Sequence, residues 1–201
     1  MQRENQRLST ALRLLKVDHR LAQIDVLSQE GSAEGGDLAT HFTFVELNAK
    51  GEPVEQPRQF RVLGDKVYIE SWVTKFSDEY VEQGDPLRST SLCLFRRLFG
   101  EAQRPVDGYA LDRNGSRPAA YRTGKEPSEL EQEIWGRFWE LANDPDEAEK
   151  LGVRVIHGEA PFQKMVPGKR YKVLLRASGG LSITAEELPP EAQPSPGGET
   201  L

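Results

Sequence analysis

Short runs in which apolar and polar residues alternate recur along most of the chain. Alternation places apolar side chains on one face of a strand, so each run predicts a half-buried strand. Most runs end at Gly, Pro, Asn or Asp residues, which favour turns. The predicted strands are residues 22–26, 40–47, 60–62, 67–76, 89–99, 153–156, 171–175 and 181–183. Turns at this spacing indicate a mainly β fold, a β-sandwich or a partly open barrel with mostly antiparallel strands.

Two of the predicted strands carry apolar residues on both faces, so each needs an apolar cover on both sides. The opposed sets are Val67, Ile69 and Val73 against Tyr68 and Trp72, and Leu92 and Leu94 against Cys93 and Phe95. The first of these strands follows Gly64-Asp65, which suits a type II′ hairpin turn because glycine adopts a positive φ at little cost.

Apolar positions return at helical rather than alternating spacing between residues 128 and 142. Ser128 and Glu131 have the spacing of a capping box. The apolar stripe comprises Leu130, Ile134, Phe138 and Leu141, widened by Trp135 and Trp139. We expect one long amphipathic helix that covers Tyr68, Trp72 and Phe76, so that Trp139→Ala lowers stability first. A short helix capped by Asp144 follows, before the last strands.

The chain divides into three segments. Residues 1–19 contain a predicted helix at 3–18, which either docks on its own domain or acts as an oligomerisation segment. Residues 20–184 form the predicted β-rich globular domain. From residue 185 to residue 201 the composition is acidic and rich in Pro and Gly, which predicts a disordered tail.

Composition and charge narrow the classes of function. The 201 residues carry a net charge of −6, which argues against a nucleic-acid partner. No apolar run reaches the length of a membrane span, and residues 1–5 lack the apolar core of a signal peptide. We expect no membrane contact by the given residues. The compartment stays open: the cytoplasm is favoured, or the cell-envelope face if an anchor precedes residue 1. The single cysteine, Cys93, excludes an internal disulfide.

The usual motifs for catalysis, metals and cofactors are missing from the sequence. There is no G-x-S-x-G elbow, no glycine-rich nucleotide loop and no histidine pair at metal-ligand spacing. We therefore predict no metal site and no cofactor. The candidates for catalysis are His157 with Glu159, which form an acid–base pair at a strand end, and His41.

Positive charge is concentrated in one part of this acidic chain. Residues 88–125 contain eight basic and three acidic side chains, a net charge of +5, with tyrosines among them. Arginine and tyrosine are enriched at protein interfaces. This pattern indicates either a solvated loop paired with the acidic residues 78–85 or a partner-binding face. The residues of that face are Arg104, Arg113, Arg117, Tyr121 and Arg122.

The preferred function is a non-catalytic binding or assembly module for an unidentified protein partner, self-associating through residues 3–18. One alternative is an enzyme or small-ligand binder that uses a pocket of the β structure. The other is a soluble domain of a membrane-anchored protein whose span lies upstream of residue 1. The first alternative depends on whether His41, His157 and a carboxylate meet in one pocket.

Overall fold

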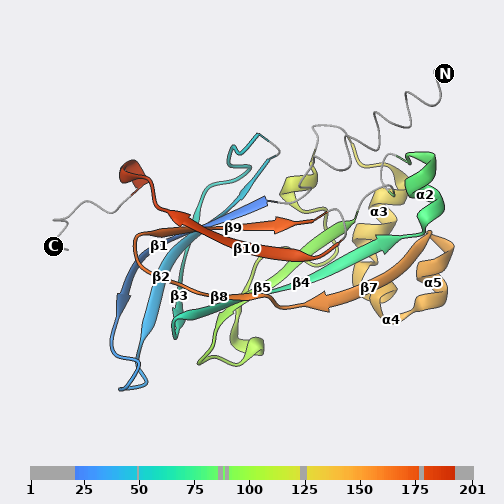
Figure 1. Ribbon diagram of the computed structural model, residues 1–201. Coiled ribbons are helices and arrows are strands. Elements are labelled where there is room, and N and C mark those ends of the chain that lie inside the picture. Colours follow the sequence, from blue (N-terminus) through green and yellow to red (C-terminus); the bar gives the residue numbers. More distant parts are fainter. Residues whose placement is uncertain are drawn as a thin grey trace.

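The fold was analysed in a computed structural model (Figure 1). It describes residues 21–48, 50–85, 88, 91–122, 126–176 and 179–192. The predicted helix at 3–18 and residues 193–201 of the predicted tail lie outside the described residues, so both stay predictions.

The described residues form two antiparallel sheets, which confirms the prediction of a mainly β fold. The first sheet has the order β10-β9-β1-β2-β3, and the second has the order β6-β5-β4-β7, with β8 paired to β4. The first sheet contains β1 (Leu21–Glu30), β2 (Ala39–Leu47), β3 (Arg58–Leu63), β9 (Lys169–Leu175) and β10 (Leu181–Glu187). The second contains β4 (Lys66–Phe76), β5 (Leu92–Gly100), β6 (Tyr109–Ala110), β7 (Val153–Glu159) and β8 (Phe162–Lys164).

The main hydrophobic core lies between the two sheets because the alternating apolar residues of both point inward. Ile24 and Phe44 from the first sheet share this core with Ile69, Cys93 and Phe95 from the second. All five side chains are at most 1% exposed. The predicted opposite faces of β5 are confirmed, since Leu92 and Leu94 belong to a separate cluster on its other side.

The helical segment after residue 128 differs from the single long helix that the spacing predicted. It consists of α3 (Glu129–Gly136), α4 (Phe138–Asn143) and α5 (Pro145–Lys150). Arg137, with φ −110° and ψ 14°, separates α3 from α4. Ser128 and Glu131 form both hydrogen bonds of the capping box. The break changes the direction of the chain just before the residues that line the site described below.

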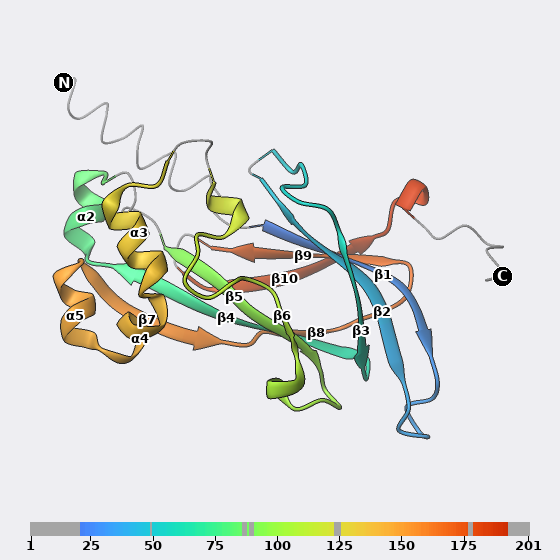
Figure 2. The same ribbon diagram turned by 180° about the vertical axis from the view of Figure 1, so that it is seen from behind.

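A second apolar cluster fills the space between these helices and the outer face of the second sheet. Figures 1 and 2 show α3, α4 and α5, with α2 (Asp78–Gln83), gathered at one end of that sheet. The helices contribute Ile134, Trp135, Phe138 and Leu141, and the strands contribute Phe76, Leu92, Leu94 and Val153. The helices therefore cover one end of the sheet and leave the other end open.

Two details of the predicted cover are wrong. Tyr68 does not meet the helices; it stacks on Phe99 with ring centroids 5.2 Å apart. Trp139 is 48% exposed, whereas its neighbour Phe138 is 1% exposed. The break at Arg137 explains the second difference, because it ends the regular spacing that put both side chains on one buried stripe.

The predicted tail also begins too early. Strand β10 continues to Glu187, and Leu188 is 2% exposed, so the folded domain extends past residue 184. A 3-10 turn follows at Pro190–Ala192. The polar outer face of β10 masked this extension in the sequence, since Glu186 and Glu187 lie on an exposed strand surface.

The predicted hairpin at Gly64-Asp65 is wrong, because β3 pairs with β2 in the first sheet and β4 pairs with β5, β7 and β8 in the second, so this turn carries the chain from one sheet to the other. Gly64 has φ +94°, a conformation that residues with a side chain rarely adopt. This turn aligns β4 so that Tyr68, Glu70 and Trp72 all face outward, as the burial pattern of the strand shows.

Candidate functional site

The histidines proposed for catalysis lie in different sheets. The His41 Nε2 atom in β2 is 3.0 Å from the Glu30 carboxylate, and the His157 Nε2 atom in β7 is 3.3 Å from the Glu159 carboxylate. Glu159 also accepts a hydrogen bond of 3.2 Å from the Leu181 N–H, which joins β7 to β10. Neither histidine lines the pocket described below. Across the described segments, no group of three or more His, Cys, Asp or Glu side chains is placed to hold a metal ion.

Two of the predicted partner-binding residues hold the 100–122 segment onto the fold. Arg117 is 14% exposed and ion-paired with Glu131 of α3 at 3.5 Å. The Tyr121 hydroxyl accepts a 2.8 Å hydrogen bond from the Cys93 N–H, and its ring packs 5.0 Å from Trp135. These contacts give both side chains a structural role, which the sequence pattern alone did not reveal.

The other three predicted residues lie on the surface and have separate neighbours. Arg104 forms a 2.8 Å ion pair with Asp107, and Arg122 lies 3.9 Å from Glu55. Arg113 is exposed and stands between two residues that line the pocket. A partner-binding role for these three side chains stays a prediction.

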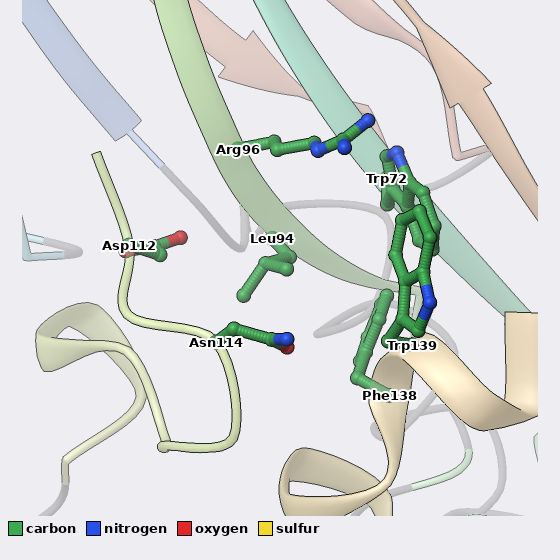
Figure 3. A pocket seen from close by; sticks show the side chains of 7 residues that line it. All are labelled: Trp72, Leu94, Arg96, Asp112, Asn114, Phe138 and Trp139. Carbon is green, nitrogen blue, oxygen red and sulfur yellow. The ribbon is translucent and has the colours of Figure 1, made fainter. Parts of the chain in front are cut away.

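A pocket of about 240 Å³ opens where the helices meet the open part of the second sheet (Figure 3). Its wall is built from β4, β5, the segment after β6 and α4. The lining residues are Trp72, Leu94, Arg96, Asp112, Asn114, Phe138 and Trp139. In the close view, Asp112 and Asn114 stand on one side and the three aromatic rings on the other, with Leu94 between them.

A β-bulge directs Arg96 to the outer face of the sheet. Glu70 pairs with Arg97 and Ser71 pairs with Phe95, so Arg96 is an extra residue in β5. Strict alternation places inward residues two positions apart, whereas Phe95 and Leu98, which both point inward, are three positions apart. With the bulge, Arg96 and Arg97 both face outward. The sequence signal was the Arg96-Arg97 pair, which interrupts an otherwise apolar strand.

Arg96 joins an ion pair to an aromatic stack. Its Nη1 atom lies 2.8 Å from a Glu70 carboxylate oxygen, and Arg97 is ion-paired with the same carboxylate. The Arg96 guanidinium carbon is 5.5 Å from the ring centroid of Trp72 and 5.0 Å from that of Trp139, within range of cation–π attraction. The two indoles stack with centroids 4.5 Å apart at an angle of 22°. These contacts fix the aromatic wall.

Backbone pairing with β5 fixes the opposite wall. The Asp112 carboxylate accepts a 2.7 Å hydrogen bond from the Phe95 N–H, and the Asp112 N–H donates to the Phe95 carbonyl at 2.9 Å. The next residues turn at Gly115, which has φ +76°, as expected of an Asn-Gly pair. The Asn114 side chain then points across the pocket toward Phe138 and Trp139 (Figure 3).

The pocket combines an apolar surface with a few polar groups. Its described lining has no histidine, serine, cysteine or lysine to act as a nucleophile or base. Its carboxylate, Asp112, is hydrogen-bonded to the strand backbone. What remains is an apolar surface bordered by a guanidinium and an amide, the composition of a site that orients a ligand by a few polar contacts.

Arg137 stabilises the break between α3 and α4 through three carboxylates. Its guanidinium lies 2.9 Å from Glu133, 2.6 Å from Glu140 and 3.0 Å from Glu147. The hydrogen bond from Arg137 lowers the pKa of Glu140 below its usual 4.5. The pKa of Glu147 is lowered by hydrogen bonds from Lys150 and from Arg137. Both carboxylates therefore bind protons less readily in the folded than in the unfolded chain.

We expect Arg137→Met to make stability less dependent on pH in acid. A lowered carboxyl pKa contributes stability above the unfolded value of 4.5, and this contribution disappears as pH falls through the folded value. The melting temperatures of wild type and variant should therefore converge as the pH falls from about 6 to about 3. Thermal melts across this range test the prediction, with Arg113→Met as an exposed arginine control. A constant difference between wild type and Arg137→Met would contradict it.

Comparison of the chain with protein families, curated proteins and solved structures finds no match. The helices in the described part of the chain are too short or too polar to span a membrane.

Proposed function

We propose that this protein is a non-catalytic binding module that holds a protein partner at the Trp72–Trp139 pocket. The observation that carries the proposal is the position of Trp139. This indole is 48% exposed, yet the Trp72 ring and the Arg96 guanidinium hold it in a defined orientation. An exposed large aromatic side chain fixed in place contributes to binding at low entropic cost, because little freedom remains to be lost.

The residue types of the pocket support a protein partner. Tryptophan and arginine are the residues most enriched where a few contacts supply most of the binding free energy. Leu94 and Phe138 give the pocket an apolar base, and Asn114 offers both a donor and an acceptor to a peptide group. Arg113 extends from the segment that forms the polar wall, so we keep it as a candidate contact at the rim.

We also propose that the two sheets form a β-sandwich rather than a barrel. Two observations support this description. First, the main core lies between the two sheets. Second, the edge strands β3 and β6 are joined through side-chain hydrogen bonds and are not paired with each other. The Tyr109 hydroxyl donates to the Arg61 carbonyl at 2.8 Å, and Arg58 donates to the Leu111 carbonyl at 3.3 Å. Self-association through residues 3–18 remains a separate proposal.

Titration with a capped phenylalanine amide tests the binding function. This probe has about 15 heavy atoms, so at about −0.3 kcal/mol per atom its dissociation constant should be about 1 mM. We expect it to shift the NMR signals of the Asn114 side-chain amide. Trp139→Ala should weaken binding about tenfold or more, because the probe loses its aromatic wall.

Phe162→Ala is the matched control, since Phe162 is another exposed aromatic residue that does not line the pocket. It should leave the Asn114 titration unchanged. Equal binding by wild type and Trp139→Ala, or no shift at Asn114 up to the solubility limit of the probe, would refute the proposed function.

A further inference from the structure

We infer that Asn114 is a site of spontaneous deamidation, at which the folded chain loses an amide from the wall of the Trp72–Trp139 pocket and gains a carboxylate. The reaction consumes only water, which the solvent supplies. The chemical step is independent of the proposed function. Its effect on binding rests on that function, because Asn114 lines the pocket proposed to hold the partner.

The reaction joins the Asn114 side chain, which belongs to a thermolabile residue type, to the backbone nitrogen of Gly115. That nitrogen loses its proton to hydroxide and attacks the side-chain carbon Cγ, which forms a cyclic succinimide. The bond from Cγ to Nδ2 breaks, and the nitrogen takes a proton from water and leaves as ammonia. A water molecule then opens the ring at Cγ to give aspartate, or at the main-chain carbonyl to give isoaspartate. The net change is the uptake of one water and the release of one ammonia.

The turn leaves both reacting groups accessible. Asn114 and Gly115 are exposed, and Gly115 has no side chain to crowd its nitrogen. Apart from the chain neighbours, the nearest atom to a Cβ built at Gly115 is the Gly136 carbonyl oxygen, 3.9 Å away. Among the residues that the structure describes, neither the Asn114 amide nor the Gly115 N–H makes a hydrogen bond that would hold it back.

The two other asparagines in the described ranges lack these features. The Asn48 amide donates to the Glu52 carboxylate at 2.8 Å, and the Asn143 amide donates to the Trp139 carbonyl at 2.7 Å. The residues that follow them in the sequence are alanine and aspartate, whose side chains hinder the attack. The structure therefore distinguishes Asn114 from both of them by its neighbour and by its hydrogen bonding.

The fold holds both ends of the turn, so a change at Asn114 reaches the pocket. Before the turn, the Asp112 N–H donates to the Phe95 carbonyl at 2.9 Å. After it, Arg117 is ion-paired with Glu131 at 3.5 Å. Isoaspartate lengthens the main chain between these two fixed points. Aspartate keeps the main chain and changes the side chain that points across the pocket (Figure 3).

Conversion also changes the charge of the pocket. Its described lining carries one guanidinium, from Arg96, and one carboxylate, from Asp112. Either product adds a second carboxylate on the side of the pocket where Asp112 stands (Figure 3). The amide donor of Asn114 is lost at the same time, because an ionised carboxylate only accepts hydrogen bonds. The converted pocket therefore favours cationic over anionic groups of a partner.

Mass spectrometry of the folded full chain, held for days at mildly alkaline pH, tests the chemical step. Fragments that contain Asn114 should show the mass gain of an amide that becomes an acid, at a rate close to that of a free peptide with the sequence of residues 110–118. Asn48 and Asn143 should keep their amides. Asn114→Gln should stay unchanged, because its longer side chain closes the ring far more slowly. An Asn114 amide that is intact when the free peptide has converted would overturn the inference.

Two probes of opposite charge measure the effect on the pocket. They are phenethylamine, a cation at neutral pH, and phenylpropanoate, an anion, each titrated against fresh and aged protein while the Trp139 indole N–H signal is followed by NMR. Ageing should raise the ratio of the cation's affinity to the anion's by about tenfold, since the new carboxylate attracts one probe and repels the other. Aged Asn114→Gln should keep the ratio of fresh Asn114→Gln.

The two measurements separate this inference from the proposed function. Conversion of Asn114 with an unchanged ratio would refute the effect on the pocket. If Asn114 converts and neither probe binds either form, the proposed function fails, and the effect on binding fails with it, while the deamidation site stands. If Asn114 keeps its amide, the inference is wrong even where both probes bind.

Discussion

Phe138→Ala is expected to lower the free energy of unfolding by about 3–5 kcal/mol, the range for removing a buried phenylalanine ring. The Phe138 side chain is 1% exposed. Its ring stacks on Trp135 with centroids 5.7 Å apart and lies 6.3 Å from Trp72. It therefore connects the helices to β4, and α4 is too short at six residues to hold together without that contact.

Equilibrium unfolding in urea measures this loss. Phe162→Ala serves as the control, because it removes the same ring from a site that is 53% exposed. The control should cost about 1 kcal/mol or less, as expected for a largely solvated side chain. Similar losses for both variants would mean that the cluster beneath α3, α4 and α5 does not stabilise the fold as described.

Arg170→Met is expected to cost about 3 kcal/mol because it leaves the partly buried Asp25 carboxylate without an ion-pair partner. The Arg170 guanidinium donates two hydrogen bonds to the Asp25 carboxylate, of 2.7 Å and 2.8 Å. The two side chains are 17% and 12% exposed. Breaking a buried pair costs about 3–5 kcal/mol, and the remaining exposure puts this one at the lower end. Urea unfolding of the variant provides the measurement.

The same strand offers a matched control for that prediction. Lys172, two residues along β9, is ion-paired with Glu186 at 2.9 Å, and both side chains are more than 40% exposed. Lys172→Met should cost about 1 kcal/mol or less, the usual contribution of a surface pair. A double-mutant cycle of Asp25→Asn with Arg170→Met isolates the coupling of the buried pair. A coupling energy near zero would contradict the structural role of this pair.

The alternation of apolar residues was a sufficient guide to strands with a buried face, such as β2, β4 and β5. It also separated the two faces of β5, with Cys93 inward and Leu94 outward. It did not predict β6 and β8, whose residues are mostly exposed. Alternation cannot reveal a bulge, however, since the extra residue Arg96 depends on how β5 pairs with β4. Helical spacing likewise cannot reveal the break at Arg137, which depends on carboxylates as far along the chain as Glu147.

The pocket could not be predicted because its walls come from segments far apart in the sequence. Trp72, Asp112 and Trp139 approach one another only after the sheet and the helices have packed. The basic segment 88–125 was a partial signal, since it supplies Arg96, Asp112 and Asn114 to the pocket, none of which was among the residues predicted to bind a partner. Tyr121 illustrates the difficulty: its hydrogen bond to the Cys93 N–H joins residues that no local pattern connects.

The stability of Trp139→Ala, measured by urea unfolding beside Phe138→Ala, tests the central claim most directly. The claim is that the exposed indole serves binding while its buried neighbour serves the fold. Trp139 stacks on Trp72, but 48% of its surface is exposed to water. Its removal should therefore lower the free energy of unfolding by about 1 kcal/mol. A loss of about 3 kcal/mol or more, close to that of Phe138→Ala, would show that Trp139 is part of the core and would contradict the claim.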